Sequence, residues 1–165
     1  KVGWGPSTHD SNLTADGQYT HITLWCILGS PLLIGCDMAE LDDFTLNLLC
    51  NSEVIDVNQD ELGWQASRIY GDDSYATYLK PLADGTVAVA MFNLSSEPKK
   101  IGFIPRSLGV IGSQVIRDLW RQKDICTCGY HERWETEVAP HGCVFVKLTP
   151  VQKNFVPEGF DKNIK

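Results

Sequence analysis

Residues 21–63 read HITLWCILGSPLLIGCDMAELDDFTLNLLCNSEVIDVNQDELG, and this stretch decides the fold. Thr14 stands where it can cap a helix whose apolar face runs as far as Gly29, which ends it. Residues 31–35 are an apolar run between helix-breaking residues, which predicts a short strand buried on both faces. A second helix is predicted to end near residue 51, and residues 54–57 then lead into a polar loop. Because a single strand has no parallel neighbour, this helix–strand–helix run predicts a piece of an α/β fold rather than a complete one.

The hydrophobic pattern changes after about Gln65. From Tyr75 onward apolar and polar residues alternate with a period of two, most clearly in residues 86–92, 113–120 and 143–148. Turn-forming residues separate these segments, and no helical pattern lies between them. Short strands at this spacing predict an antiparallel sandwich or barrel. Residues 151–165 are rich in Lys and contain Pro and Gly, which predicts a surface extension or a disordered tail.

Length and charge narrow the class of protein. The chain of 165 residues has room for one ordinary domain, or for a small domain and a piece of another. Its formal net charge of −7 argues against nucleic acid as a partner, because phosphate binding needs a patch of Lys and Arg. No apolar run reaches the ~20 residues of a membrane helix, so the sequence predicts no membrane partner.

Six cysteines are too few for a disulfide scaffold. Cys26 and Cys50 fall within apolar helical patterns, which predicts small buried side chains. A second group of Cys and His residues could hold zinc: Cys126, Cys128, His131, His141 and Cys143. Alternatively, Cys126 or Cys128 could form a disulfide with Cys143. The spacing of Cys126 and Cys128 differs from the usual zinc knuckle, so the sequence assigns no metal ligand. A disulfide from this pair to Cys143 stays an open alternative.

Several segments carry a family resemblance when they are taken together. They are LTADGQYTH at residues 13–21, SPLLIGCD at 30–37, EVIDVNQD at 53–60, RDLW at 117–120 and APHG at 139–142. In this order they resemble the α-galactosidases of glycoside hydrolase family 27, the melibiases. The resemblance implies that residues 1–65 end a (β/α)8 TIM barrel, that residues 66–150 form an antiparallel β-sandwich of Greek-key type, and that residues 151–165 are a tail.

The resemblance also implies a function. Enzymes of this family are retaining glycosidases that remove terminal α-galactose, and such chemistry needs two carboxyl groups about 5–5.5 Å apart. In the family both are aspartates on barrel strands that have no counterpart here, so the sequence assigns no catalytic or substrate-binding residue and no cofactor. The chain alone is therefore predicted to be inactive. Its expected partners are an α-galactoside held by the missing barrel and either a second copy or the missing barrel itself. The resemblance favours a secreted, periplasmic or lysosomal protein over a cytoplasmic one.

A few residues remain candidates for a site. Asp37 follows the remaining barrel strand, and barrel active sites lie at the carboxyl ends of strands, so we expect it behind the groups that contact substrate. The alternative is that Asp37 caps the following helix. Asp42 and Asp43 are expected at a helix N-terminus, and His21 is expected to be packed or half-buried. Trp134 is the tryptophan most expected to be exposed for sugar contact.

Two further expectations follow from the missing barrel. A non-catalytic module that binds carbohydrate or has a structural role is the alternative to the enzyme. Since unpaired strands recruit partners, the chain alone is predicted to self-associate or to be poorly ordered in its N-terminal third.

Overall fold

The computed structural model describes residues 9–151, so all but the first residue of the predicted tail lies outside the described residues. The helices are α1 (Ala15–Ile27), η2 (Met38–Glu40), α2 (Asp43–Leu49), α3 (Ser52–Asn58) and η3 (Pro105–Leu108), of which η2 and η3 are single 3-10 turns. The strands are β1 (Ser67–Gly71), β2 (Tyr75–Pro81), β3 (Val87–Asn93), β4 (Lys99–Phe103), β5 (Gln114–Asp118), β6 (Lys123–Cys128), β7 (Trp134–Val138) and β8 (Cys143–Pro150).

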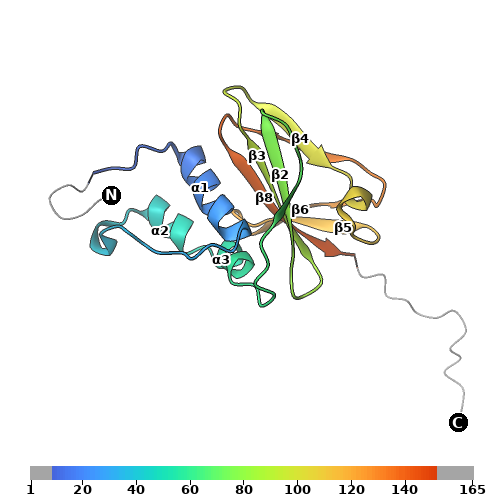
Figure 1. Ribbon diagram of the computed structural model, residues 1–165, viewed down its shortest axis with the longest axis horizontal. Coiled ribbons are helices and arrows are strands. Elements are labelled where there is room, and N and C mark those ends of the chain that lie inside the picture. Colours follow the sequence, from blue (N-terminus) through green and yellow to red (C-terminus); the bar gives the residue numbers. More distant parts are fainter. Residues whose placement is uncertain (1–8, 152–165) are drawn as a thin grey trace, which may run out of the picture.

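The strands form a sandwich of two antiparallel sheets. The larger sheet has six strands in the order β1-β2-β3-β8-β5-β6, and the smaller pairs β4 with β7. Strand β8 returns from the end of the chain to lie between β3 and β5, a connection of Greek-key type. Helices α1 and α3 pack against the larger sheet on the face away from β4 and β7, so the molecule has three layers (Figure 1). The predicted sandwich is confirmed.

Strand β3 lies at the centre of these layers, and all seven of its residues are buried. Val89 and Met91 belong to the core between the two sheets. Ala90 and Phe92 point the other way and belong to the core between the larger sheet and the helices. The two-sided apolar pattern of residues 86–92 therefore reflects burial on both faces of the strand.

Helix α1 forms where the sequence predicts it. The Thr14 hydroxyl accepts a hydrogen bond from the Gly17 amide at 3.1 Å, which satisfies one of the free N–H groups of the first turn. The helix ends before Gly29, whose φ of +64° is a backbone conformation that glycine adopts without strain. Its buried residues Thr23, Cys26 and Ile27 face the larger sheet.

The prediction for residues 54–57 was wrong, because they belong to helix α3 and not to the approach of a loop. Asn51 begins this helix, and its side-chain oxygen accepts a hydrogen bond from the Val54 amide at 3.2 Å. An Asn at this position is a strong helix-start signal. Val54 and Val57 are one helical turn apart and both face the core, so α3 is as firmly packed as α1.

The strand predicted over residues 31–35 is absent from the described part of the chain. These residues are irregular in the structure, and Leu33 is 91% exposed. A strand exists only through hydrogen bonds to a neighbour, and residues 9–151 provide none here. The part before β1 therefore consists, as far as it is described, of helices and one unpaired segment. The predicted division at residue 65 stays a prediction.

Candidate functional site

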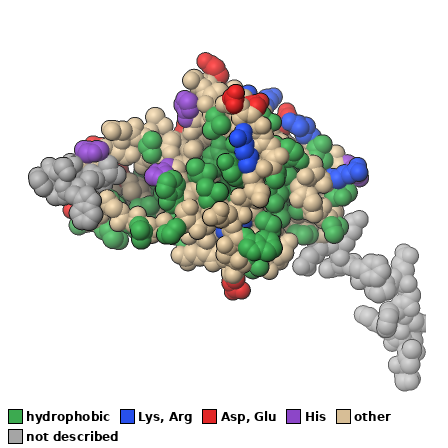
Figure 2. All heavy atoms as spheres, in the orientation of Figure 1, with side chains coloured by type: hydrophobic (Ala, Val, Ile, Leu, Met, Phe, Trp, Pro, Cys, Tyr) green, Lys and Arg blue, Asp and Glu red, His purple; other side chains and the backbone are tan. Residues whose placement is uncertain are grey.

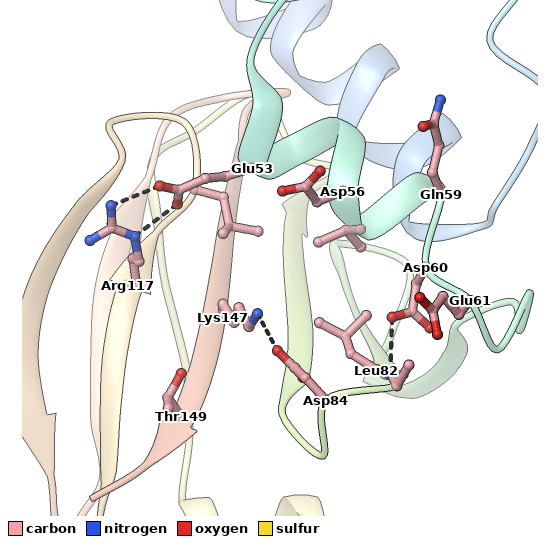
Figure 3. Close-up of a pocket in the computed structure, with 13 residues that line it drawn as sticks. Glu53, Asp56, Gln59, Asp60, Glu61, Leu82, Asp84, Arg117, Lys147 and Thr149 are labelled. Atoms are coloured by element: carbon pink, nitrogen blue, oxygen red, sulfur yellow. Dashed lines mark hydrogen bonds and ion pairs between the residues drawn. The ribbon is translucent and has the colours of Figure 1, made fainter.

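The larger hollow, which we call the polar pocket, lies between α3 and the ends of β5 and β8 (Figure 3). It has a volume of about 700 Å³. The loop after α3 and the turn between β2 and β3 complete its wall. Its charged lining residues are Glu53, Asp56, Asp60, Glu61, Asp84, Arg117 and Lys147.

Both basic side chains of the polar pocket, Arg117 and Lys147, form ion pairs. Arg117 donates from Nε and Nη2 to the two carboxylate oxygens of Glu53, at 2.8 and 2.7 Å, and from Nη1 to Asp124 at 2.9 Å. These hydrogen bonds, to Glu53 first and then to Asp124, raise the pKa of Arg117. The fork-to-fork geometry of Glu53 and Arg117 ties α3 to β5.

Lys147 forms the second pair, with Asp84 at 2.7 Å. Burial alone would raise the pKa of Asp84, but hydrogen bonds from Lys147 and Thr86 outweigh it and lower the pKa to about 2. Asp84 is thus held as a charged acceptor. A glycosidase acid must instead keep its proton near neutral pH, so Asp84 is unsuited to that role, and both ion pairs act as structural ties.

The second hollow, which we call the apolar groove, lies between α1, residues 32–36 and α2. It has a volume of about 230 Å³. Large apolar side chains line it and remain accessible: Leu33 is 91%, Ile34 51% and Trp25 41% exposed. Figure 2 shows hydrophobic side chains at the surface of the helical part of the molecule as well as over the sheets. Exposed apolar clusters of this kind mark interaction surfaces.

Two of the predicted site residues, Asp37 and Asp42, serve as helix caps. The Asp37 carboxylate accepts from the Ala39 amide at 2.9 Å and caps η2, which is the alternative the sequence left open. Its role near a substrate stays a prediction. Asp42 caps α2 through the Thr45 amide at 2.7 Å, and hydrogen bonds from Thr45 lower its pKa. His21 is exposed, with its ring 4.5 Å from that of Trp25.

The aromatic and cysteine predictions have mixed outcomes. Trp134 is only partly exposed, and its ring packs 5.2 Å from that of Phe103. All six cysteines are free thiols, so the disulfide to Cys143 is not formed. Cys26 is fully buried as predicted, whereas Cys50 is exposed. Across residues 9–151, no group of three or more His, Cys, Asp or Glu side chains could hold a metal ion.

Lys80 is fully buried between the helices and the sheet, and the sequence pattern does not predict this burial. Its ammonium group donates a hydrogen bond to the Val57 carbonyl at the end of α3, where the helix dipole favours a cation. Burial lowers the pKa of Lys80, while nearby Asp60 and Cys26 oppose that shift. The only signal in the sequence is a lysine within an alternating strand.

Comparison with known proteins agrees with this architecture. The family model for α-galactosidase A matches residues 8–60, and the model for the α-galactosidase C-terminal β-sandwich domain matches residues 72–148. A probable α-galactosidase of Dictyostelium discoideum is 38% identical over 137 residues, which are 79% of this chain and 35% of the relative.

Solved structures of similar fold also come from glycoside hydrolases. A family 27 β-L-arabinopyranosidase of Geobacillus stearothermophilus is 32% identical with a TM-score of 0.80, over 87% of this chain and 32% of that one. A putative α-N-acetylgalactosaminidase of Bacillus halodurans is 25% identical with a TM-score of 0.83, over 88% of this chain and 34% of that one.

The fold and the sequence matches define the closing part of a barrel-and-sandwich glycoside hydrolase. The chain belongs to the glycoside hydrolase family 27 α-galactosidases, and it corresponds to their C-terminal part. It spans between a fifth and about a third of the length of the curated relatives it matches. Within residues 9–151, no helix has the length and apolar character needed to cross a membrane.

Proposed function

We propose that this chain is part of a retaining glycoside hydrolase that removes terminal α-galactosyl residues, with both catalytic carboxylates outside residues 1–165. The observation that carries the proposal is the 38% identity to a probable α-galactosidase, which extends over 137 residues. That length is too great for either the helical part or the sandwich alone to account for it. The alternative of a non-catalytic module has no comparable support.

The contribution of this chain to such an enzyme is mechanical. Helices α1 and α3 share a core with β3 and β8, and polar contacts reinforce the packing. The Trp120 indole donates to the Thr23 hydroxyl at 2.8 Å, and the Asn51 amide donates to the Leu119 and Trp120 carbonyls at 3.1 Å each. These contacts hold the last helices of a barrel on the sandwich, and so they would fix the position of barrel residues that carry out the reaction.

An activity assay on two matched proteins tests the proposal. The chain alone is expected to release no nitrophenol from nitrophenyl α-galactoside. The same chain, fused to the part of the Dictyostelium discoideum relative that precedes the matched region, is expected to turn this substrate over. The preceding part alone serves as the control. Turnover by the isolated chain would show that the catalytic carboxylates lie within it and would contradict the proposal.

Substrate preference and location are further parts of the proposal. The structural neighbours include a putative α-N-acetylgalactosaminidase and a β-L-arabinopyranosidase, so the assay should include nitrophenyl N-acetylgalactosaminide and arabinopyranoside beside the α-galactoside. We expect the α-galactoside to be the fastest. We also propose a secreted, periplasmic or lysosomal location, on the family resemblance alone, and fractionation of the native cells tests it. Recovery of the protein only from the cytosol would contradict this location.

A further inference from the structure

Two sequons for N-linked glycosylation, each an Asn two residues before a Ser or Thr, occur in the chain. The first is NLT at residues 12–14, and the second is NLS at residues 93–95. Neither has the proline at the middle position that prevents modification. The motif alone does not choose between them, because both contain the residues that the transferase recognises. Their surroundings in the structure differ, and the difference selects the first.

The first sequon is open to solvent. Asn12 is exposed, and it lies in the irregular segment that leads into α1 on the side of the helices away from the strands (Figure 1). Within residues 9–151, no hydrogen bond or ion pair engages its side chain. The backbone beside it is held, because the Leu13 amide donates to the Ser11 hydroxyl at 3.2 Å and Thr14 caps α1. An oligosaccharide on Asn12 would therefore extend into solvent and break no contact of the described chain.

The second sequon is closed by packing. Asn93 is 1% exposed at the end of β3. Its amide nitrogen donates to the carbonyls of Glu97, Val138 and Ala139, at 2.8, 3.0 and 3.1 Å. Its side-chain oxygen accepts from the Ser95 amide at 3.0 Å. A sugar bonded to this nitrogen would break buried hydrogen bonds and would need volume that a packed strand end does not have. A chain modified at Asn93 therefore cannot adopt this fold.

We propose that Asn12 carries an N-linked oligosaccharide, added in the secretory pathway of a eukaryotic cell, and that Asn93 does not. This goes beyond the proposed activity and rests on the proposed secreted or lysosomal location. In the reaction, the amide nitrogen of Asn12 bonds to C1 of the first sugar of a lipid pyrophosphate-linked oligosaccharide. The bond from that carbon to the pyrophosphate oxygen breaks, the lipid pyrophosphate leaves with the bonding electrons, and the amide nitrogen loses one proton. The product is a bulky, solubilising group just before α1.

Peptide mass spectrometry of protein secreted by eukaryotic cells tests the assignment. The protein is this chain fused behind the preceding part of the Dictyostelium discoideum relative. Peptide N-glycosidase in heavy-oxygen water converts each glycosylated Asn into labelled Asp. We expect the label at position 12 and none at position 93. An unlabelled Asn12, in the secreted fusion or in protein purified from its native cells, would overturn the proposal, as would a labelled Asn93.

Translation in the presence of microsomes covers the case of a fusion that is not secreted. The chain behind a signal peptide should show a mobility shift that peptide N-glycosidase removes. Asn12→Gln should lose the shift of one glycan, whereas Asn47→Gln, at an exposed Asn outside any sequon, should keep it. The same shift in wild type and Asn12→Gln, or no shift in wild type, contradicts the proposal.

Variants of Thr14 separate the glycan from the helix cap, because its hydroxyl serves both the sequon and α1. Thr14→Ser keeps a capping hydroxyl and should keep the glycan, whereas Thr14→Ala should lose both. Asn12→Gln should lose the glycan and leave the cap in place. Retention of the Asn12 glycan in Thr14→Ala would contradict recognition of this sequon.

The readouts also separate this inference from the proposed function. A glycan on Asn12 without turnover of nitrophenyl α-galactoside supports the modification and contradicts the activity. Turnover by a secreted fusion whose Asn12 is unmodified supports the activity and contradicts the modification.

Discussion

The two sides of the helical layer differ sharply. Toward the sheet, Cys26 and Ile27 are fully buried, and Val54 is 1% exposed. On the groove side, Leu33 is 91% and Ile34 51% exposed. The same short stretch of chain thus contains both a completed core and an incomplete one. Because buried apolar area is the main source of stability, the sheet side should determine whether this chain folds, and the groove side should determine what it binds.

Polar groups follow the same division. On the sheet side the side chains of Lys80 and Asn51 both find hydrogen-bond partners. On the groove side the backbone of residues 32–35 finds none within the described chain. A buried polar group without a partner is costly, so the paired side is complete as it stands and the unpaired side tolerates exposure only because water reaches it.

The largest expected effect comes from a core residue of the sheet side. Phe145 is 1% exposed and packs with the helices, so Phe145→Ala should lower the free energy of unfolding by about 3–5 kcal/mol. Leu33→Ala is the control on the groove side and should change it by less than about 0.5 kcal/mol. Denaturant unfolding of both variants measures the contrast. Similar losses in the two would show that the groove is already packed in this chain.

A smaller loss is expected where α3 begins. Asn51→Ala removes the helix cap and the bonds to the Leu119 and Trp120 carbonyls, and should cost about 2–3 kcal/mol. Asn47 is exposed within α2, so Asn47→Ala should leave stability unchanged or slightly higher. Thermal unfolding of the two alanine variants compares them. An unchanged melting temperature for Asn51→Ala would mean that α3 is not fastened to the sheet.

The stability of the protein at alkaline pH reports on two thiols on the sheet side of the helices. Burial raises the pKa of Cys26 to about 12 and that of Cys143 to about 11, against an ordinary value of 9.0. The folded thiols stay protonated where the unfolded ones ionise, so their stabilising contribution is complete below pH 9 and is lost as pH rises above it. At pH 10 the expected loss is about 1.4 kcal/mol for each thiol.

Cysteine variants isolate this effect. The pKa of Lys80 is lowered by burial, so its contribution changes with the opposite sign as pH rises, and loss of the Cys26 thiol, which opposes that shift, strengthens this opposite change in the variant. Cys26→Ala with Cys143→Ala should therefore flatten the fall in unfolding free energy between pH 9 and 11 relative to wild type. Parallel pH profiles for the two proteins would contradict burial of these thiols.

The smallest expected effect is at the edge of the polar pocket. The side chains of Glu53 and Arg117 are 25% and 34% exposed, so Glu53→Gln should cost only about 1 kcal/mol. Glu135 pairs with Arg133 at a more exposed position, and Glu135→Gln should cost less than about 0.5 kcal/mol. Urea unfolding distinguishes the two. A larger loss at Glu135 would show that the Glu53 pair does not join α3 to β5.

Local pattern predicted most of this fold. The alternation over residues 86–92 correctly placed β3, and the cap at Thr14 correctly placed α1. The strand over residues 31–35 failed because a strand depends on a partner that local sequence does not contain. Helix α3 departs from the prediction because Asn51 caps a new helix there, although polar residues follow Val57 directly.

Contacts between residues far apart in the sequence also limit what could be predicted of the candidate site. The place of Asp37 after an expected strand predicts a site residue, and the structure assigns it a capping role. Lys80 and the Glu53–Arg117 pair are long-range contacts, and no spacing along the chain marks them.

Amide hydrogen exchange of the isolated chain tests the contrast between the two sides most directly. Exchange reports local opening, so amides of α1 and α3 that face the sheet should be as protected as those of β3 and β8, while residues 32–35 exchange at rates close to those of an open chain. Protection of residues 32–35 equal to that of β3, or fast exchange throughout α1 beside a protected sheet, would contradict the division into a closed side and an open one.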